Sequence, residues 1–135
     1  MKKMNNKGFS LVELIVVIAI MAVLVGVLAP QFIKYVESSR RSTDISNAQN
    51  IQSAVLADIA EGSITDSTPG TGFTPSVGTP TALGEVPLVK GNKVATAQGT
   101  NAWTVNYNAA SGTCSVFIST YELTSTSGAS EYKEP

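Results

Sequence analysis

One carboxylate stands inside the most apolar stretch of this 135-residue chain. Glu13 is followed, from Leu14 to Ala29, by side chains that carry neither a charge nor a hydrogen-bonding group. An acid at the centre of a bilayer costs about 2.5–3.5 kcal/mol on insertion scales. Glu13 is therefore either a residue at the membrane boundary whose carboxylate reaches the headgroups, or an acid with a function inside the apolar layer.

Residue types for other chemistry are scarce. The chain has no histidine and one cysteine, which removes His-based triads, His–metal sites and C-x-x-C redox centres. It contains no P-loop and no G-x-G-x-x-G that opens a helix after a strand. We therefore expect no enzymatic activity, no metal and no cofactor, although two acids could still converge in space. The remaining acids are scattered along the chain and include Asp44, Asp58, Glu61, Asp66, Glu85 and Glu122.

The element that positions Glu13 is predicted to be a membrane helix. A spanning helix needs about 20 mostly apolar residues. The segment from Leu14 to Ile33 meets this requirement, with Gln31 as its one hydrogen-bonding side chain. Lysines precede the segment, and the positive-inside rule then places the N-terminus in the cytoplasm.

This helix has a predicted weak point between Gly26 and Pro30. Pro30 has no N–H to donate to the carbonyl of Gly26, and glycine is itself a poor helix former. The weak point predicts at least a kink.

The run from Gly8 to Leu14, G-F-S-L-V-E-L, resembles the processing site of type IV pilins and pseudopilins. The resemblance implies that residues 1–8 are a basic leader, removed after Gly8 by a prepilin peptidase, and that Phe9 is then N-methylated. It implies that Glu13 pairs with the freed amino group of a neighbouring subunit, which offsets the burial of both charges. Pro30 also falls where many members place a proline.

An ordinary secretory signal is the main competing interpretation of the N-terminus. Val27-Leu28-Ala29 resembles an A-x-A cleavage site. Pro30 after the cut would suit signal peptidase poorly, the apolar run is long for a signal, and Glu13 would stay unexplained. We therefore expect the helix to be retained.

Charge and cysteine content narrow the class further. Removing the three leader lysines leaves six basic and ten acidic residues, a formal charge of −4, which argues against a nucleic-acid binder. The basic residues just past the membrane are expected to meet headgroups or neighbouring acids. Cys114 is alone and cannot form an intramolecular disulfide, so we expect a buried thiol and, within the family, a disulfide-free pilin of the Gram-positive kind. The basic residues just past the predicted membrane helix are Lys34, Arg40 and Arg41.

Apolar residues recur at three- and four-residue steps after Pro30, which predicts that the helix continues, from about Phe9 to Glu61, with one apolar stripe in its second half. Residues 63–81 are rich in Ser, Thr, Pro and Gly and predict a surface loop. Strands are predicted at 85–89 and 93–97, and a hairpin joins 102–107 to 113–122. The stripe comprises Ile45, Ala48, Ile51 or Gln52, Val55 and Ile59.

The sequence thus predicts an α+β fold, a long N-terminal helix packed on a small antiparallel sheet. Its segments are a leader (1–8), an apolar helix half (9–33), an amphipathic half (34–62), a surface loop (63–84), a sheet (85–124) and a polar tail (125–135). The expected function is a type IV pilus subunit that polymerises through its helix into a surface fibre, for adhesion, motility or DNA uptake. A pseudopilin of a secretion or competence system is the alternative, and a membrane-anchored binding domain is the third interpretation.

Overall fold

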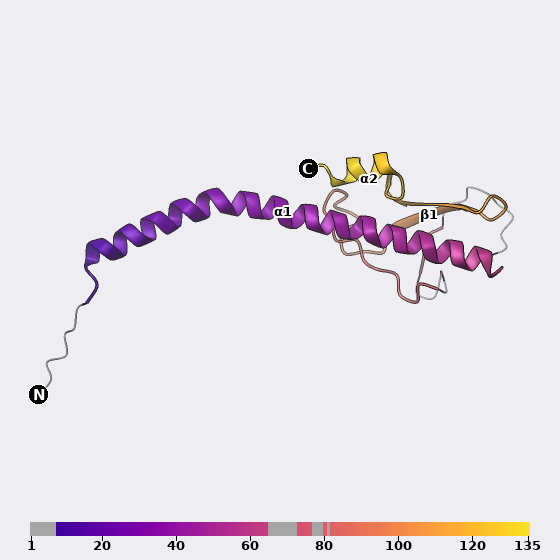
Figure 1. Ribbon diagram of the computed structural model, residues 1–135, viewed down its shortest axis with the longest axis horizontal. Helices are drawn as coiled ribbons and strands as arrows, with labels where there is room; N and C mark the ends of the chain where they lie inside the picture. Colours follow the sequence, from indigo (N-terminus) through magenta and orange to yellow (C-terminus); the bar gives the residue numbers. More distant parts are fainter. Residues whose placement is uncertain (1–7, 65–72, 77–79, 81) are drawn as a thin grey trace, which may run out of the picture. The chain divides into compact units, whose positions relative to one another are not determined.

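The computed structural model describes residues 8–64, 73–76, 80 and 82–135. Its elements are α1 (Leu11–Ala60), β1 (Trp103–Asn108), β2 (Thr113–Ile118), β3 (Tyr121–Glu122) and α2 (Thr126–Lys133) (Figure 1). The chain forms two compact units, Met1–Tyr35 and Val36–Pro135, which are described separately. The α+β fold with a long N-terminal helix and a small antiparallel sheet is confirmed.

The first unit is the apolar part of α1. Its many Val and Ile residues are mediocre helix formers in water, but in lipid the backbone must satisfy its own hydrogen bonds, and a helix does so. The helix runs uninterrupted through Gly26 and Pro30. Residues 1–7 of the expected leader lie outside the described residues.

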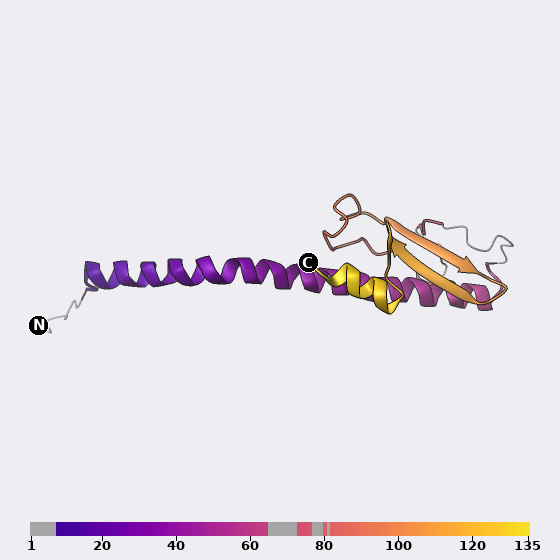
Figure 2. The same ribbon diagram turned by 90° about the horizontal axis from the view of Figure 1, so that it is seen from above.

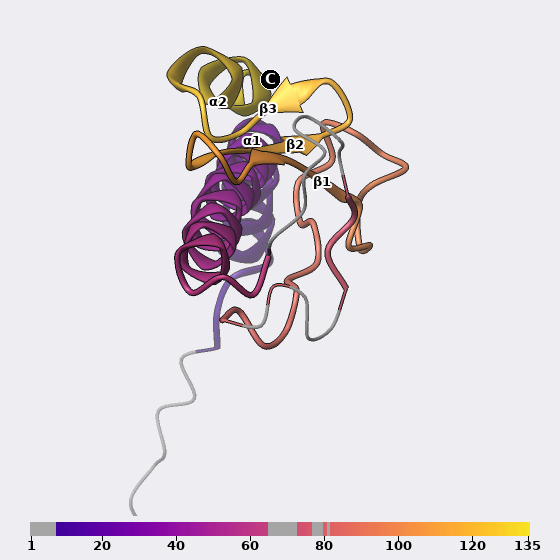
Figure 3. The same cartoon turned by 90° about the vertical axis from the view of Figure 1, so that its right-hand side faces the viewer.

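The core of the second unit lies between the later part of α1 and the sheet, as Figures 2 and 3 show. The predicted stripe is correct, because Ala48, Ile51 and Val55 are fully buried and Ile59 packs against the same core. Full burial of an aliphatic side chain of this size contributes about 1.5–3 kcal/mol. Facing them from the sheet are the fully buried side chains of Trp103, Val105, Val116 and Ile118.

The sheet has the antiparallel order β1-β2-β3. In the β1–β2 hairpin Val105 lies opposite Val116, and Tyr107 lies opposite Cys114. Buried side chains alternate with less buried ones along both strands, as the period of two predicted. On the other edge of β1, Phe73 and Val105 exchange two backbone hydrogen bonds of 2.9 Å.

Two predicted strands, 85–89 and 93–97, are not strands in the structure. Pro87 has no N–H for a ladder, and its carbonyl accepts a hydrogen bond from Trp103 Nε1 at 2.7 Å. Val89 instead closes a loop, donating to the Thr100 carbonyl and accepting from Gly99 N–H, both at 2.8 Å. Val86, Val89 and Ala97 in this region are buried against the core without any sheet pairing, whereas Leu88 is exposed.

The predicted polar tail, 125–135, is also wrong, because it forms α2. Ser125 caps this helix, its Oγ accepting from Gly128 N–H at 3.1 Å. Tyr132 is fully buried, which anchors the helix. The predicted surface loop falls largely outside the described residues, but Pro75 and Pro80 within it are buried, so the loop is not wholly superficial.

Candidate processing and assembly site

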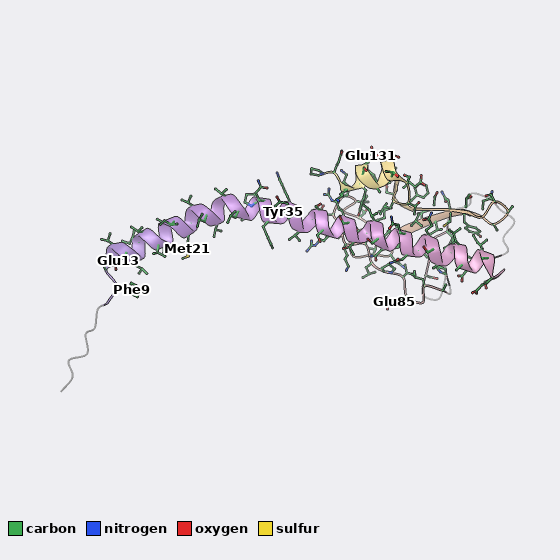
Figure 4. The ribbon with its side chains drawn as sticks, in the orientation of Figure 1. Phe9, Glu13, Met21, Tyr35, Glu85 and Glu131 are labelled. Carbon is green, nitrogen blue, oxygen red and sulfur yellow. The ribbon has the colours of Figure 1, made fainter. Side chains whose placement is uncertain are left out.

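The residues predicted to be processed lie just before α1 begins. Gly8, Phe9 and Ser10 have no regular secondary structure, and all three are exposed. The side chain of Phe9 is 92% exposed, and Figure 4 shows it at the start of the helix close to Glu13. The peptide bond between Gly8 and Phe9 therefore lies in an exposed segment outside the helix, where a protease can reach it.

Ser10 and Glu13 form a reciprocal cap at the start of α1. Glu13 Oε2 accepts from the backbone N–H of Ser10 at 2.9 Å, and Ser10 Oγ accepts from the N–H of Val12 at 3.3 Å. The Leu14 N–H donates to the Ser10 carbonyl at 3.2 Å. This is a variant of the capping box in which Ser10 Oγ accepts from the N–H of Val12 and not from that of Glu13; its signature S-x-x-E is present in the sequence at Ser10 to Glu13.

The first unit exposes an apolar surface on all sides of α1. Its large hydrophobic side chains from Leu11 to Tyr35 are between 49% and 73% exposed, far more than a water-soluble surface tolerates in one contiguous patch. This part of α1 is long and apolar enough to cross a membrane. Together with the motif before it, the helix indicates membrane anchoring.

Of the basic residues expected to meet headgroups or neighbouring acids, Arg40 and Arg41 contact a neighbouring acid, Glu37. Lys34 and Arg40 are exposed, and Arg40 Nη1 lies 4.0 Å from Glu37 Oε2. Arg41, by contrast, is 7% exposed and turned into the second unit, where its Nε donates to Glu37 Oε1 at 3.1 Å. Arg41 is therefore a structural residue of that unit.

A buried polar cluster, which the sequence did not predict, joins α1 to the end of the chain. Asp44 is fully buried; its Oδ1 accepts from the Lys90 N–H at 2.8 Å, and its Oδ2 accepts from the Gly91 N–H at 2.7 Å. The hydroxyl of Tyr132 also donates to Asp44 Oδ2, at 2.8 Å. Burial, and next this hydrogen bond to Asp44, raise the pKa of Tyr132, so it stays a donor.

Arg41 completes the polar cluster beside Asp44. Its Nη2 donates to Asn92 Oδ1 at 3.0 Å, and its Nη1 donates to the carbonyl of Glu134. Gly91 fits because a Cβ there would lie only 2.8 Å from Asp44 Oδ2 and from the Tyr132 hydroxyl oxygen. The polar cluster thus fastens α1, the Gly91 turn and α2 to one another.

Cys114 is buried in β2, as expected, and burial raises the pKa of its thiol to about 11. The reactive thiolate is then about 100-fold scarcer at pH 8 than in the unfolded chain, where the value is near 9.0. We expect iodoacetamide at pH 8 to label native protein at least 100-fold more slowly than protein in 6 M guanidinium. Mass spectrometry of the labelled chain measures both rates. Comparable rates in both conditions would contradict the burial of this thiol.

Comparisons with known proteins point to the same N-terminal segment. The family described as the prokaryotic N-terminal methylation motif matches residues 3–29. A Clostridium perfringens protein, prepilin peptidase-dependent protein A, is 39% identical over 77 residues, which cover 56% of this chain and 55% of that protein. The match thus spans about half the length of the curated relative. No solved structure matches. The resemblance of the N-terminus to prepilin-type sequences is confirmed.

Proposed function

We propose that this chain is a structural subunit of a type IV pilus. It is inserted in the membrane as a precursor, cleaved after Gly8, N-methylated at Phe9 and polymerised through α1 into a surface fibre. The observation that carries the proposal is an apolar helix, exposed on all sides, that begins directly at a prepilin-type motif. The relative from Clostridium perfringens, whose name makes it dependent on prepilin peptidase, supports the peptidase as a partner.

Assembly transfers the apolar part of α1 from lipid into a core of like helices. Little apolar surface leaves water in such a transfer, so packing and polar contacts must provide the specificity. Glu13 is the acid available in the apolar helix, and in the proposed fibre it pairs with the amino group of Phe9 on a neighbouring subunit. A helix docked at the wrong height would leave both charges buried and unpaired.

The other proposed partners follow from this mechanism. Extraction from the membrane requires work, which we assign to an assembly platform and a motor ATPase. The subunit resides in the cytoplasmic membrane before assembly, with its N-terminus in the cytoplasm, and at the cell surface afterwards. We propose neither a catalytic role nor nucleic-acid binding for it. Adhesion, twitching motility and DNA uptake are all compatible with such a fibre.

A pseudopilin of a type II secretion or competence system is the second candidate, because the matched motif covers only residues 3–29. N-terminal mass spectrometry of material sheared from cells separates the two. Sheared filaments of chains that begin at methylated Phe9 would support the pilin. Processed chains found only in the membrane fraction would favour the pseudopilin, and an N-terminus at Met1 or Pro30 would refute both. A membrane-anchored binding domain, the third candidate, would keep its leader and begin at Met1.

The weak point at Gly26 and Pro30 gives a prediction for the fibre. The helix is continuous there in the single subunit, but we expect it to unwind partly when neighbouring helices pack against it, because Pro30 leaves the Gly26 carbonyl without its helical donor. A density map of the fibre at side-chain resolution checks this. Unbroken helix through Val27 would contradict it, and Pro30→Ala is the matched variant expected to straighten the segment.

A further inference from the structure

The carbonyl of Gly8 is the group attacked in the proposed cleavage, and it lies four residues before Val12. In an α-helix each N–H donates to the carbonyl four residues earlier, so a helix extended by one turn would join the Val12 N–H to the Gly8 carbonyl. In the structure the Val12 N–H donates to Ser10 Oγ instead, at 3.3 Å. The Val12 N–H, which would otherwise donate to the carbonyl of the bond to be cleaved, therefore donates to Ser10.

Apolar surroundings favour such an extension. The first N–H groups of a helix lack intrahelical partners, and in lipid an unsatisfied N–H is costly, so the helix tends to grow until its donors are satisfied. At this helix start, side chains satisfy two of them. Ser10 Oγ accepts from Val12, and Glu13 Oε2 accepts from the Ser10 N–H at 2.9 Å. The helix can thus begin at Leu11 and leave Gly8 and Phe9 outside it.

We propose that Ser10 is a positioning residue for leader removal, an inference that rests on the proposed function. Its hydroxyl keeps the Gly8 carbonyl outside the helix. Hydrolysis adds the oxygen of water to the Gly8 carbonyl carbon and breaks its bond to the Phe9 nitrogen. Gly8 leaves as a carboxylate, and the Phe9 nitrogen takes both protons of the water and becomes an ammonium group. A carbonyl inside a helical turn is hydrogen-bonded and shielded, whereas Gly8 is an exposed residue outside the helix.

The test measures initial rates of cleavage of the full-length precursor in membranes that contain a prepilin peptidase. Ser10→Ala is expected to slow cleavage about 2- to 30-fold, the range that loss of an N-cap hydroxyl produces in a helix-end equilibrium. Ser10→Thr keeps the hydroxyl and is expected to retain most of the rate. The double variant Ser10→Ala/Val12→Pro is expected to recover cleavage, because proline has no N–H to capture the Gly8 carbonyl and is tolerated in the first helical turn.

A second measurement detects directly whether the Gly8 carbonyl is hydrogen-bonded within the helix. Carbon-13 at the Gly8 carbonyl shifts its infrared band, and Ser10→Ala in bicelles is expected to move that band to the helical position, whereas Ser10→Thr leaves it unchanged. A band unmoved by Ser10→Ala overturns the proposal, even if cleavage slows.

The outcomes separate this inference from the function on which it rests. A wild-type chain that is not cut between Gly8 and Phe9 overturns the proposed function. Wild-type cleavage with an equally fast Ser10→Ala variant overturns only the role of Ser10. Slow cleavage of Ser10→Ala that Val12→Pro does not restore, although Val12→Pro alone is cut normally, indicates direct recognition of the hydroxyl by the peptidase and also overturns the proposal.

Discussion

Replacing Glu13 by glutamine is expected to leave the subunit in the membrane, processed but unable to grow a fibre. Removing one partner of a buried ion pair costs about 3–5 kcal/mol, since the other charge remains buried and unpaired. A loss of this size at every subunit contact lowers the affinity of each addition by more than about 100-fold. The measurement is an immunoblot of sheared and membrane fractions, in which we expect less than about 1% of the wild-type fibre yield.

The choice of replacement separates two functions of Glu13. Glutamine at this position can still accept from the Ser10 N–H, so Glu13→Gln keeps the capping box and loses only the charge. Glu13→Ala loses both and is expected to slow leader removal as well. Glu13→Asp is the control that keeps the charge on a shorter side chain. A wild-type fibre yield from Glu13→Gln would refute the pairing role.

Replacing Asp44 by alanine is expected to unfold much of the second unit at physiological temperature. The change leaves the N–H groups of Lys90 and Gly91 and the hydroxyl of Tyr132 without their acceptor. Each of these three groups, left without a partner, costs about 1–3 kcal/mol, so a loss of about 3–9 kcal/mol is expected, against a typical total stability of about 5–15 kcal/mol.

Thermal unfolding of a fragment comprising residues 36–135 checks this prediction, with the fluorescence of the buried Trp103 as the signal. We expect the midpoint to fall by at least about 12 °C for Asp44→Ala, which is the lower end of the expected loss on a scale of about 4–8 °C for each kcal/mol. Tyr132→Phe removes one hydrogen bond and should lower it by a smaller amount. Glu131→Ala, an exposed neighbour on α2, is the matched control. A midpoint for Asp44→Ala within about 4 °C of the wild type would show that the polar cluster does not stabilise the unit.

The structure also shows how the C-terminal residues are attached to the second unit. With one cysteine, the second unit has no intramolecular disulfide to fix its last residues. The polar cluster fixes these residues by hydrogen bonds instead. The hydroxyl of Tyr132 donates to Asp44, and Arg41 donates to the carbonyl of Glu134. A segment with the composition of a frayed tail is therefore an anchored helix.

Features encoded by consecutive residues could be predicted from the sequence. The motif from Gly8 to Leu14, the apolar run after it and the alternation in the β1–β2 hairpin each lie within one short stretch. Local sterics and hydrophobic periodicity act on such stretches directly. The fold class, the helix and the N-terminal processing motif were correct for this reason, and the capping box could have been found from S-x-x-E as well.

Features that depend on partners distant in the chain were decided only by the tertiary structure. Tyr132 becomes an anchor because Asp44, 88 residues earlier, accepts its hydroxyl hydrogen. The stretch from 85 to 97 is apolar enough for strands, yet Trp103 takes the carbonyl of Pro87 and the segment closes into loops. A buried polar group or a backbone carbonyl must find some partner, but composition cannot specify which one; the packing of α1 against the sheet selects it.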